Sequence, residues 1–172
     1  MLKAAHSVGI SKIGIFAEPS KDFPSQVVSR VSAIPSLALS KNYLVCQNLT
    51  KGQKYDDTDL ITINSFWGEQ NTLEAAVKKG LGIEVLVKDT RKLGGMALGD
   101  WFEQLSDLHA FCKLKHCQLV ISSGASAPNE LVSGRCLDAI LAQCAISPIQ
   151  YWSSLCSWLK SVFAKRVTRV AA

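Results

Sequence analysis

The sequence predicts an α/β fold built around a parallel β-sheet. Strand-like apolar segments alternate with helix-like segments along the chain, and this order is typical of parallel strands joined by helical crossovers. Six strand candidates and at least five helix candidates are present, too few for a complete eight-fold barrel. The last strand candidate runs directly into Ser122-Ser123-Gly124, as expected where ligand contacts gather at a strand end. With 172 residues, we expect one domain spanning 1–172.

The candidate strands are short apolar runs bounded by turn residues. Ser29 and Arg30 fall within the second run, and we expect their polar side chains to face out of the core. The six runs are Ile10 to Ala17, Val27 to Ala33, Tyr43 to Gln47, Asp59 to Ile63, Ile83 to Val87 and Gln118 to Ile121.

Capping residues and apolar periodicity predict the helices. Asn71 and Asp100 each precede a glutamate by three positions, which indicates two helix starts, and Gly80 can end the first helix. Ser133 is a good N-cap, and Pro148 suits the first position of a final helix after Ser147. A short helix from Met1 to Val8 is also expected. The expected buried stripes are Leu73, Ala76 and Val77; Trp101, Leu105, Leu108 and Cys112; Leu137, Ile140, Leu141 and Cys144; and Trp152, Leu155, Cys156, Leu159 and Phe163.

Composition narrows the class of protein. The net charge of +5 permits a polyanionic partner without requiring one. No apolar run is long enough to cross a bilayer, and the first residues lack a secretory pattern. The six cysteines are dispersed and never form Cys-x-x-Cys, which is typical of reduced thiols in a cytosolic protein. We therefore expect a cytoplasmic protein with no membrane partner.

The sequence contains no recognisable catalytic constellation. Its three histidines, His6, His109 and His116, are scattered and cannot readily supply a multi-metal site. Ser122 and Ser123 lack the Gly-x-Ser-x-Gly context of a nucleophilic serine. We expect no catalytic residue and no metal bound by the protein itself.

The loop after the last strand candidate is the best candidate for binding phosphate. Ser122, Ser123 and Ser126 could donate hydrogen bonds, as could backbone N–H groups around Gly124. Arg135 could add a bidentate phosphate contact. A tight turn capped by its own serines is the alternative. Two basic clusters could add to such binding or merely form solvated surfaces: Lys88, Arg91 and Lys92; and Lys160, Lys165, Arg166 and Arg169.

The run Ile121-Ser-Ser-Gly-Ala-Ser, followed by Glu130-Leu131, Ser133 and Arg135, resembles the family of ribonuclease P protein component 3, the counterpart of the eukaryotic 30-kDa subunit. The chain departs from the family at Val132, where relatives often carry the first arginine of Arg-Ser-Pro-Arg. Weaker similarity covers residues 5–15, Arg30-Val31, Asp59 to Ile61, Ala75 to Val77 and Gly82 to Asp89.

The resemblance implies a TIM-barrel-like parallel barrel of the PHP type. Members usually open with a strand before the first helix, so this barrel is expected to be incomplete at its N-terminus. The implied function is that of a ribonuclease P subunit, which assists a catalytic RNA in removing the 5′ leader of precursor tRNA. The RNA subunit and its Mg²⁺ would carry the chemistry. The implied partners are ribonuclease P RNA, precursor tRNA and a Pop5-type subunit, the two proteins forming a heterotetramer.

The RNA-contacting residues expected from the loop, the basic clusters and the resemblance are Arg30, Lys88, Arg91, Ser122, Ser123, Gly124, Ser126, Arg135, Lys160, Lys165, Arg166 and Arg169. Two other functions stay open. The same strand-end loop could hold phosphate in a metal-dependent phosphoesterase or a sugar-phosphate enzyme. The last helix, with Trp152 and Trp158 on different faces, could instead serve a protein-interaction scaffold.

Overall fold

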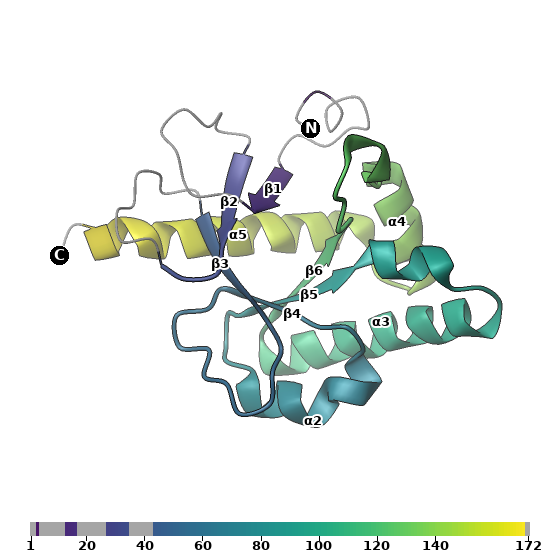
Figure 1. Ribbon diagram of the computed structural model, residues 1–172, viewed down its shortest axis with the longest axis horizontal. Coiled ribbons are helices and arrows are strands. Elements are labelled where there is room, and N and C mark those ends of the chain that lie inside the picture. Colours follow the sequence, from purple (N-terminus) through teal and green to yellow (C-terminus); the bar gives the residue numbers. More distant parts are fainter. Residues whose placement is uncertain (1–2, 4–12, 17–26, 35–42, 171–172) are drawn as a thin grey trace.

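Six parallel strands form one sheet at the centre of the protein (Figure 1). The computed structural model describes residue 3 and residues 13–16, 27–34 and 43–170, the last five by backbone alone. The strands lie side by side in chain order, every neighbouring pair is parallel, and β1 and β6 form the edges. The strands are β1 (Ile13–Phe16), β2 (Val27–Val31), β3 (Tyr43–Asn48), β4 (Leu60–Thr62), β5 (Gly82–Leu86) and β6 (Gln118–Ser122).

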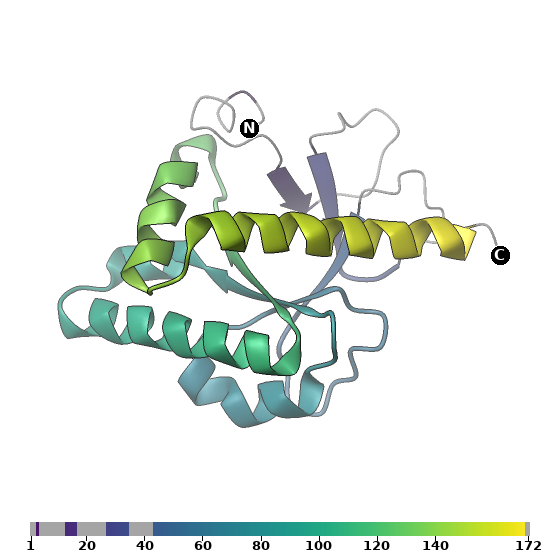
Figure 2. The same cartoon turned by 180° about the vertical axis from the view of Figure 1, so that it is seen from behind.

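The helices lie on both faces of this sheet. Two of them connect consecutive strands and lie together on one face, because right-handed crossovers between sequential parallel strands place their helices on the same side. The last helix passes along the opposite face, in front of the strands in Figure 2. The elements are α2 (Phe66–Ala76), η1 (Val87–Lys92), α3 (Met96–Lys115), η2 (Pro128–Glu130), α4 (Gly134–Gln143) and α5 (Pro148–Val170).

Each face of the sheet has its own apolar core. The outer face, under α2, α3 and α4, buries Ile61, Ile83 and Leu119. The inner face, under α5, buries Val28, Leu44, Cys46 and Leu60 against Trp158 and Val162 of that helix. Leu60 and Ile61, neighbours in β4, thus enter different cores, as the two-residue repeat of a strand requires, and Val31, Tyr43 and Val45 of β2 and β3 form a smaller cluster.

Close contact between α5 and the sheet depends on a glycine in β5. A Cβ atom at Gly82 would lie 2.6 Å from Leu60 Cδ1 and 2.7 Å from Trp158 Cζ2. The indole N–H of Trp158 donates to the carbonyl of Gly80 at 2.8 Å. Tyr151, also on α5, accepts a hydrogen bond from the backbone N–H of Ile121 at 2.9 Å and so satisfies a donor on the β6 edge. These contacts fix α5 along the inner face.

All six expected strands are present near their predicted positions, but one expectation about their faces is wrong. Ser29 is 1% exposed, and Arg30 is directed inward to Glu84 rather than out of the core. Val27, Val28 and Val31 are buried as well, so neither side of β2 offers a polar residue a solvent-exposed position. The helix expected from Met1 to Val8 and the ends of the first strand candidate lie outside the described residues.

Two helix starts differ from expectation. Helix α2 begins at Phe66, after the N-cap Ser65, whose hydroxyl accepts from the N–H of Gly68 at 3.2 Å; Asn71 lies in the middle of the helix. Helix α3 begins at Met96, after Gly95, so Asp100 lies inside it. In contrast, Ser133 caps α4 as expected, accepting from Cys136 at 3.2 Å, and α5 begins at Pro148.

The buried stripe of α5 is also displaced from expectation. Cys156 is exposed, whereas Trp158 and Val162 are buried. The face that meets the sheet therefore follows Tyr151, Leu155, Trp158 and Val162, a spacing of three or four residues that forms one side of a helix. The stripes expected on α3 and α4 are confirmed at Leu105, Leu108, Cys112, Leu137, Leu141 and Cys144, which are all buried, whereas Trp101 and Ile140 are half-buried.

The architecture is an α/β half-barrel. The sequential all-parallel strand order, with connecting helices on one face, is compatible with part of a TIM-like barrel. Among the described residues, no helix combines the length and apolar character needed to cross a membrane.

Candidate functional site

The carboxyl ends of the strands meet at one edge of the sheet, which we call the carboxyl edge. Ser122 ends β6 there, and η1 follows β5 directly. The backbone N–H of Lys88 donates to the carbonyl of Ser123 at 3.0 Å. Gly124 has a φ of +66°, and a Cβ at this position would lie 2.8 Å from Lys88 Cδ. The loop that follows β6 therefore packs against η1. The side chain of Lys88, on η1, lies across this loop at Gly124.

Three backbone donors of this loop are already used within the chain. Ser123 Oγ accepts from the N–H of Ala125 at 3.2 Å, and the carboxylate of Glu130 accepts from Ser126 at 2.6 Å and Ala127 at 3.2 Å. These backbone hydrogen bonds lower the pKa of Glu130. The expected phosphate cradle of N–H groups around Gly124 is therefore, at these three amides, a turn capped by its own side chains.

The groups of this region that a ligand can reach are exposed basic side chains. Lys88 and Arg91 are both exposed on η1, and the Arg91 guanidinium donates to the carbonyl of Glu130. Arg135 is exposed in the first turn of α4, two residues after its N-cap Ser133. Ser126 is exposed as well. The structure thus brings together the cations of η1, the loop after β6 and the start of α4.

Beneath this edge, a buried ion pair crosses the inner face. Arg30 of β2 holds Glu84 of β5 in a bidentate pair, with Nη1–Oε1 at 2.7 Å and Nη2–Oε2 at 2.5 Å. Glu84 is 0% exposed. Burial alone would lower the pKa of Arg30, but the hydrogen bonds and the charge of Glu84 outweigh that effect and raise it. Arg30, expected as an RNA contact, has its guanidinium turned to Glu84.

Two hydroxyls complete the surroundings of Glu84. Thr62 donates to Oε2 at 2.6 Å, and Ser122 donates to Oε1. Ser122 was expected to face a phosphate, but its hydroxyl donates its hydrogen bond to the buried carboxylate of Glu84. Cys46 lies beside this pair, and burial raises its pKa to about 11, so it remains a thiol. The sequence signal for this site is a single charged residue in the apolar run Ile83-Glu84-Val85, and Glu84 is not among the residues expected at a site.

The Arg30 side chain also touches the edge strand β1. Its guanidinium carbon lies 4.6 Å from the centroid of the Phe16 ring. A Cβ at Gly14 would lie 3.1 Å from Arg30 Cδ, so the glycine leaves room for the arginine stem. The arginine is thus fixed by a carboxylate at its head and by β1 along its side.

The C-terminal basic cluster lies elsewhere. Lys160 and Lys165 are exposed on α5, as expected, and Val162 is buried beneath them. However, Lys165 lines a cleft of about 150 Å³ with Asp56, Asp57 and Gly80, just before β5. That cleft is at the amino ends of the strands, opposite the carboxyl edge. The structure therefore separates Lys165 from Lys88 and Arg91, and the side chains of Arg166 and Arg169 lie outside the described part.

Trp152 and Trp158, which could have formed a protein-interaction surface, make their contacts within the protein instead. Trp158 packs on Gly82, and the indole N–H of Trp152 donates to Asp138 at 2.6 Å. In the described ranges, no three histidine, cysteine, aspartate or glutamate side chains gather into a group that could hold a metal ion. Burial and the charge of Lys113 lower the pKa of His109.

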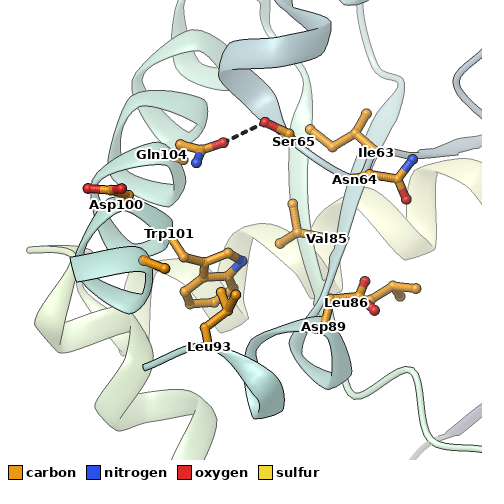
Figure 3. Close-up of a pocket in the computed structure, with 11 residues that line it drawn as sticks. Ile63, Asn64, Ser65, Val85, Leu86, Asp89, Leu93, Asp100, Trp101 and Gln104 are labelled. Atoms are coloured by element: carbon orange, nitrogen blue, oxygen red, sulfur yellow. Dashed lines mark hydrogen bonds between the residues drawn. The ribbon is translucent and has the colours of Figure 1, made fainter. Parts of the chain in front are cut away.

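A cavity of about 310 Å³ opens at the carboxyl ends of β4 and β5, between η1 and the first turns of α3 (Figure 3). Asn64 and Ser65 follow β4, Leu86 and Asp89 come from β5 and η1, and Trp101 extends from α3. Trp101 was expected only as part of a buried stripe. It is half-buried and lines this cavity.

Comparison of the chain with models of protein families, with curated proteins and with solved structures found no match.

Proposed function

We propose that this protein is a cytoplasmic accessory subunit of ribonuclease P that binds the catalytic RNA and assists 5′-leader removal from precursor tRNA. The RNA and its Mg²⁺ would carry the chemistry, and a Pop5-type subunit would complete the protein heterotetramer. The resemblance of residues 121–137 to the component 3 family supports this proposal, and those residues lie at the carboxyl edge.

One observation carries the proposal. Lys88 and Arg91 are exposed and fixed against the segment that follows β6, and Arg135 is exposed in the first turn of α4, the helix that comes next in the chain. Fixed cations of this kind can neutralise phosphates of a folded RNA without any reacting group of their own.

Reconstitution tests the proposal directly. Purified protein should leave precursor tRNA uncut when alone, and should raise its cleavage when added to the RNA subunit and the Pop5-type partner. Failure to raise cleavage would contradict the proposal. Hydrolysis of a generic phosphoester with Mn²⁺ or Zn²⁺ would favour the phosphoesterase or sugar-phosphate enzyme.

Replacing Arg135 with alanine should weaken RNA binding and leave the fold intact, because Arg135 is exposed and lies just inside α4. Loss of one phosphate contact should reduce the slope of log affinity against log salt by about one. Lys113→Ala is the matched control, since Lys113 is exposed at the far end of α3. An unchanged slope together with unchanged precursor cleavage would remove Arg135 from the interface.

Neutralising the C-terminal cluster should lower RNA affinity at low salt and have a much smaller effect at high salt. The variant replaces Lys160, Lys165, Arg166 and Arg169 together with glutamine, which keeps helix propensity. Binding is measured across a salt series, with circular dichroism as the folding control. If the quadruple variant binds as tightly as the parent at low salt, the segment is only a solubilising surface.

A further inference from the structure

We infer that Ser122 is a positioning residue: its hydrogen bond to Glu84 fixes the loop after β6 so that Lys88 presents its charge to an RNA phosphate. This inference rests on the proposed RNA-binding function and assigns the residue that holds the phosphate-binding edge in shape. The Ser122 hydroxyl donates to a buried carboxylate, so its contribution to RNA binding passes through the loop and not through a contact of its own.

The carboxylate of Glu84 has a fixed orientation. A carboxylate offers about four acceptor positions, and in Glu84 all of them are filled. Arg30 takes one position on each oxygen, at 2.7 Å to Oε1 and 2.5 Å to Oε2. Thr62 donates to the second position on Oε2 at 2.6 Å, and Ser122 donates to the second position on Oε1. Because the planar guanidinium fork fixes the plane of the carboxylate, the direction of the bond to Ser122 is fixed as well.

A buried ion pair is not the most stable way to fill a protein interior. Apolar side chains of similar volume often stabilise a fold as well or better, because charged groups must be removed from water. Apolar contacts have no preferred direction, whereas a hydrogen bond holds a hydroxyl at one distance and angle. The network around Glu84 therefore supplies a directional contact at the end of β6, where a strand-end loop of fixed shape begins.

Ser122 connects this buried network to the loop. It is the last residue of β6, an edge strand that is paired on one side only, with β5. The carbonyl of the next residue, Ser123, accepts from the backbone N–H of Lys88 at 3.0 Å. One residue further, Gly124 lies so close to the Lys88 side chain that an added Cβ would be 2.8 Å from its Cδ. The two residues that follow Ser122 thus both contact Lys88.

These contacts hold the stem of Lys88 before RNA binds. Lys88 is exposed, and a free lysine stem has four flexible carbon–carbon bonds that must be ordered when its ammonium meets a phosphate. A stem that already lies across Gly124 loses less conformational entropy on binding. Without the hydroxyl of Ser122, the end of β6 can move away from Glu84, and the loop no longer holds the stem.

Two measurements on the full chain test this inference. In Ser122→Ala, the backbone N–H of Lys88 should exchange with solvent about tenfold faster, because a hydrogen bond to a charged group contributes enough free energy for such a change. The same variant should bind ribonuclease P RNA with a slope of log affinity against log salt that is smaller by about one, the loss of one phosphate contact. Ser122→Thr keeps the hydroxyl and should restore both properties.

Thr62→Val is the matched control. It removes the other hydroxyl that donates to Glu84, but Thr62 ends β4, which is followed by α2 and not by the loop. Both Ser122→Ala and Thr62→Val leave one acceptor position of the buried carboxylate unfilled, so both should lower the midpoint of thermal unfolding. Only Ser122→Ala should change the exchange of the Lys88 amide and the salt slope, which separates positioning from a loss of stability alone.

The outcomes distinguish this inference from the proposed function. If Ser122→Ala and Thr62→Val give the same exchange rate and the same salt slope, Ser122 has only a structural role, and the inference is wrong while the proposed function stands. The inference is equally wrong if the Lys88 amide exchanges faster in Ser122→Ala but the salt slope is unchanged. If the parent protein does not bind the RNA, the proposed function fails and the phosphate contact of Lys88 fails with it. The exchange of the Lys88 amide then still decides whether Ser122 positions the loop.

Discussion

Replacing Glu84 with methionine is expected to lower the free energy of unfolding by about 3–5 kcal/mol, because it leaves the Arg30 guanidinium buried without its carboxylate. The side chain of Arg30 is only 11% exposed, so water cannot readily replace the lost partner. Thr62 and Ser122 would lose their acceptor in the same step. Chemical denaturation of the parent and the variant measures the loss.

A double-mutant cycle distinguishes the ion pair from simple packing. Arg30→Met combined with Glu84→Met should be less destabilising than the sum of the two single changes, because no unpaired charge remains buried. If the losses in free energy of unfolding are additive, Arg30 and Glu84 contribute to the stability of the protein independently of each other. A loss below about 1 kcal/mol for Glu84→Met alone would contradict the buried pair.

Adding one methyl group at Gly82 is expected to destabilise the protein by about 1–3 kcal/mol, as overpacking of a filled core does. The new Cβ would lie 2.7 Å from Trp158 Cζ2, so the indole must move away from the inner face. Thermal and chemical unfolding of Gly82→Ala measure the effect.

Gly94→Ala is the matched control, since an added Cβ there meets no atom within 4 Å. Combining Gly82→Ala with Trp158→Leu should remove only the part of the loss that is due to the indole, because Leu60 Cδ1 still lies 2.6 Å from the added Cβ. If Gly82→Ala is as stable as Gly94→Ala, α5 does not pack on β5 as described.

The strands and two of the helical stripes could be predicted from the sequence because they depend on local patterns. The apolar run ending at Ile121 and the spacing of Leu105, Leu108 and Cys112 need no distant partner to be recognised. The start of α2 could not be chosen in this way, because both Ser65 and Asn71 are good caps. Tertiary contact decides it, since Phe66 packs on Phe111 at 5.4 Å between ring centroids.

The candidate site was predicted in part. Lys88 and Arg91 do contact the segment that follows β6 at the carboxyl edge, and Arg135 is exposed in the first turn of α4, which begins four residues after Glu130. The Glu84–Arg30 pair could not be predicted, because its members are 54 positions apart and nothing in the sequence shows that α5 covers the inner face. The capping of this loop by Glu130 could not be predicted either, because Ala127 lacks the side-chain oxygen that makes a capping box recognisable in a sequence.

The ribosome synthesises all six strands before α5, the helix that covers the inner face of the sheet. Until Trp158 and Val162 emerge, Val28, Leu44 and Leu60 have no partner layer on that face and remain in water. A nascent chain halted before this point carries a broad apolar surface, the kind that aggregates or recruits chaperones. The inner face is therefore covered only after α5 has been synthesised, and a chain interrupted within α5 leaves the apolar side chains of that face exposed to water.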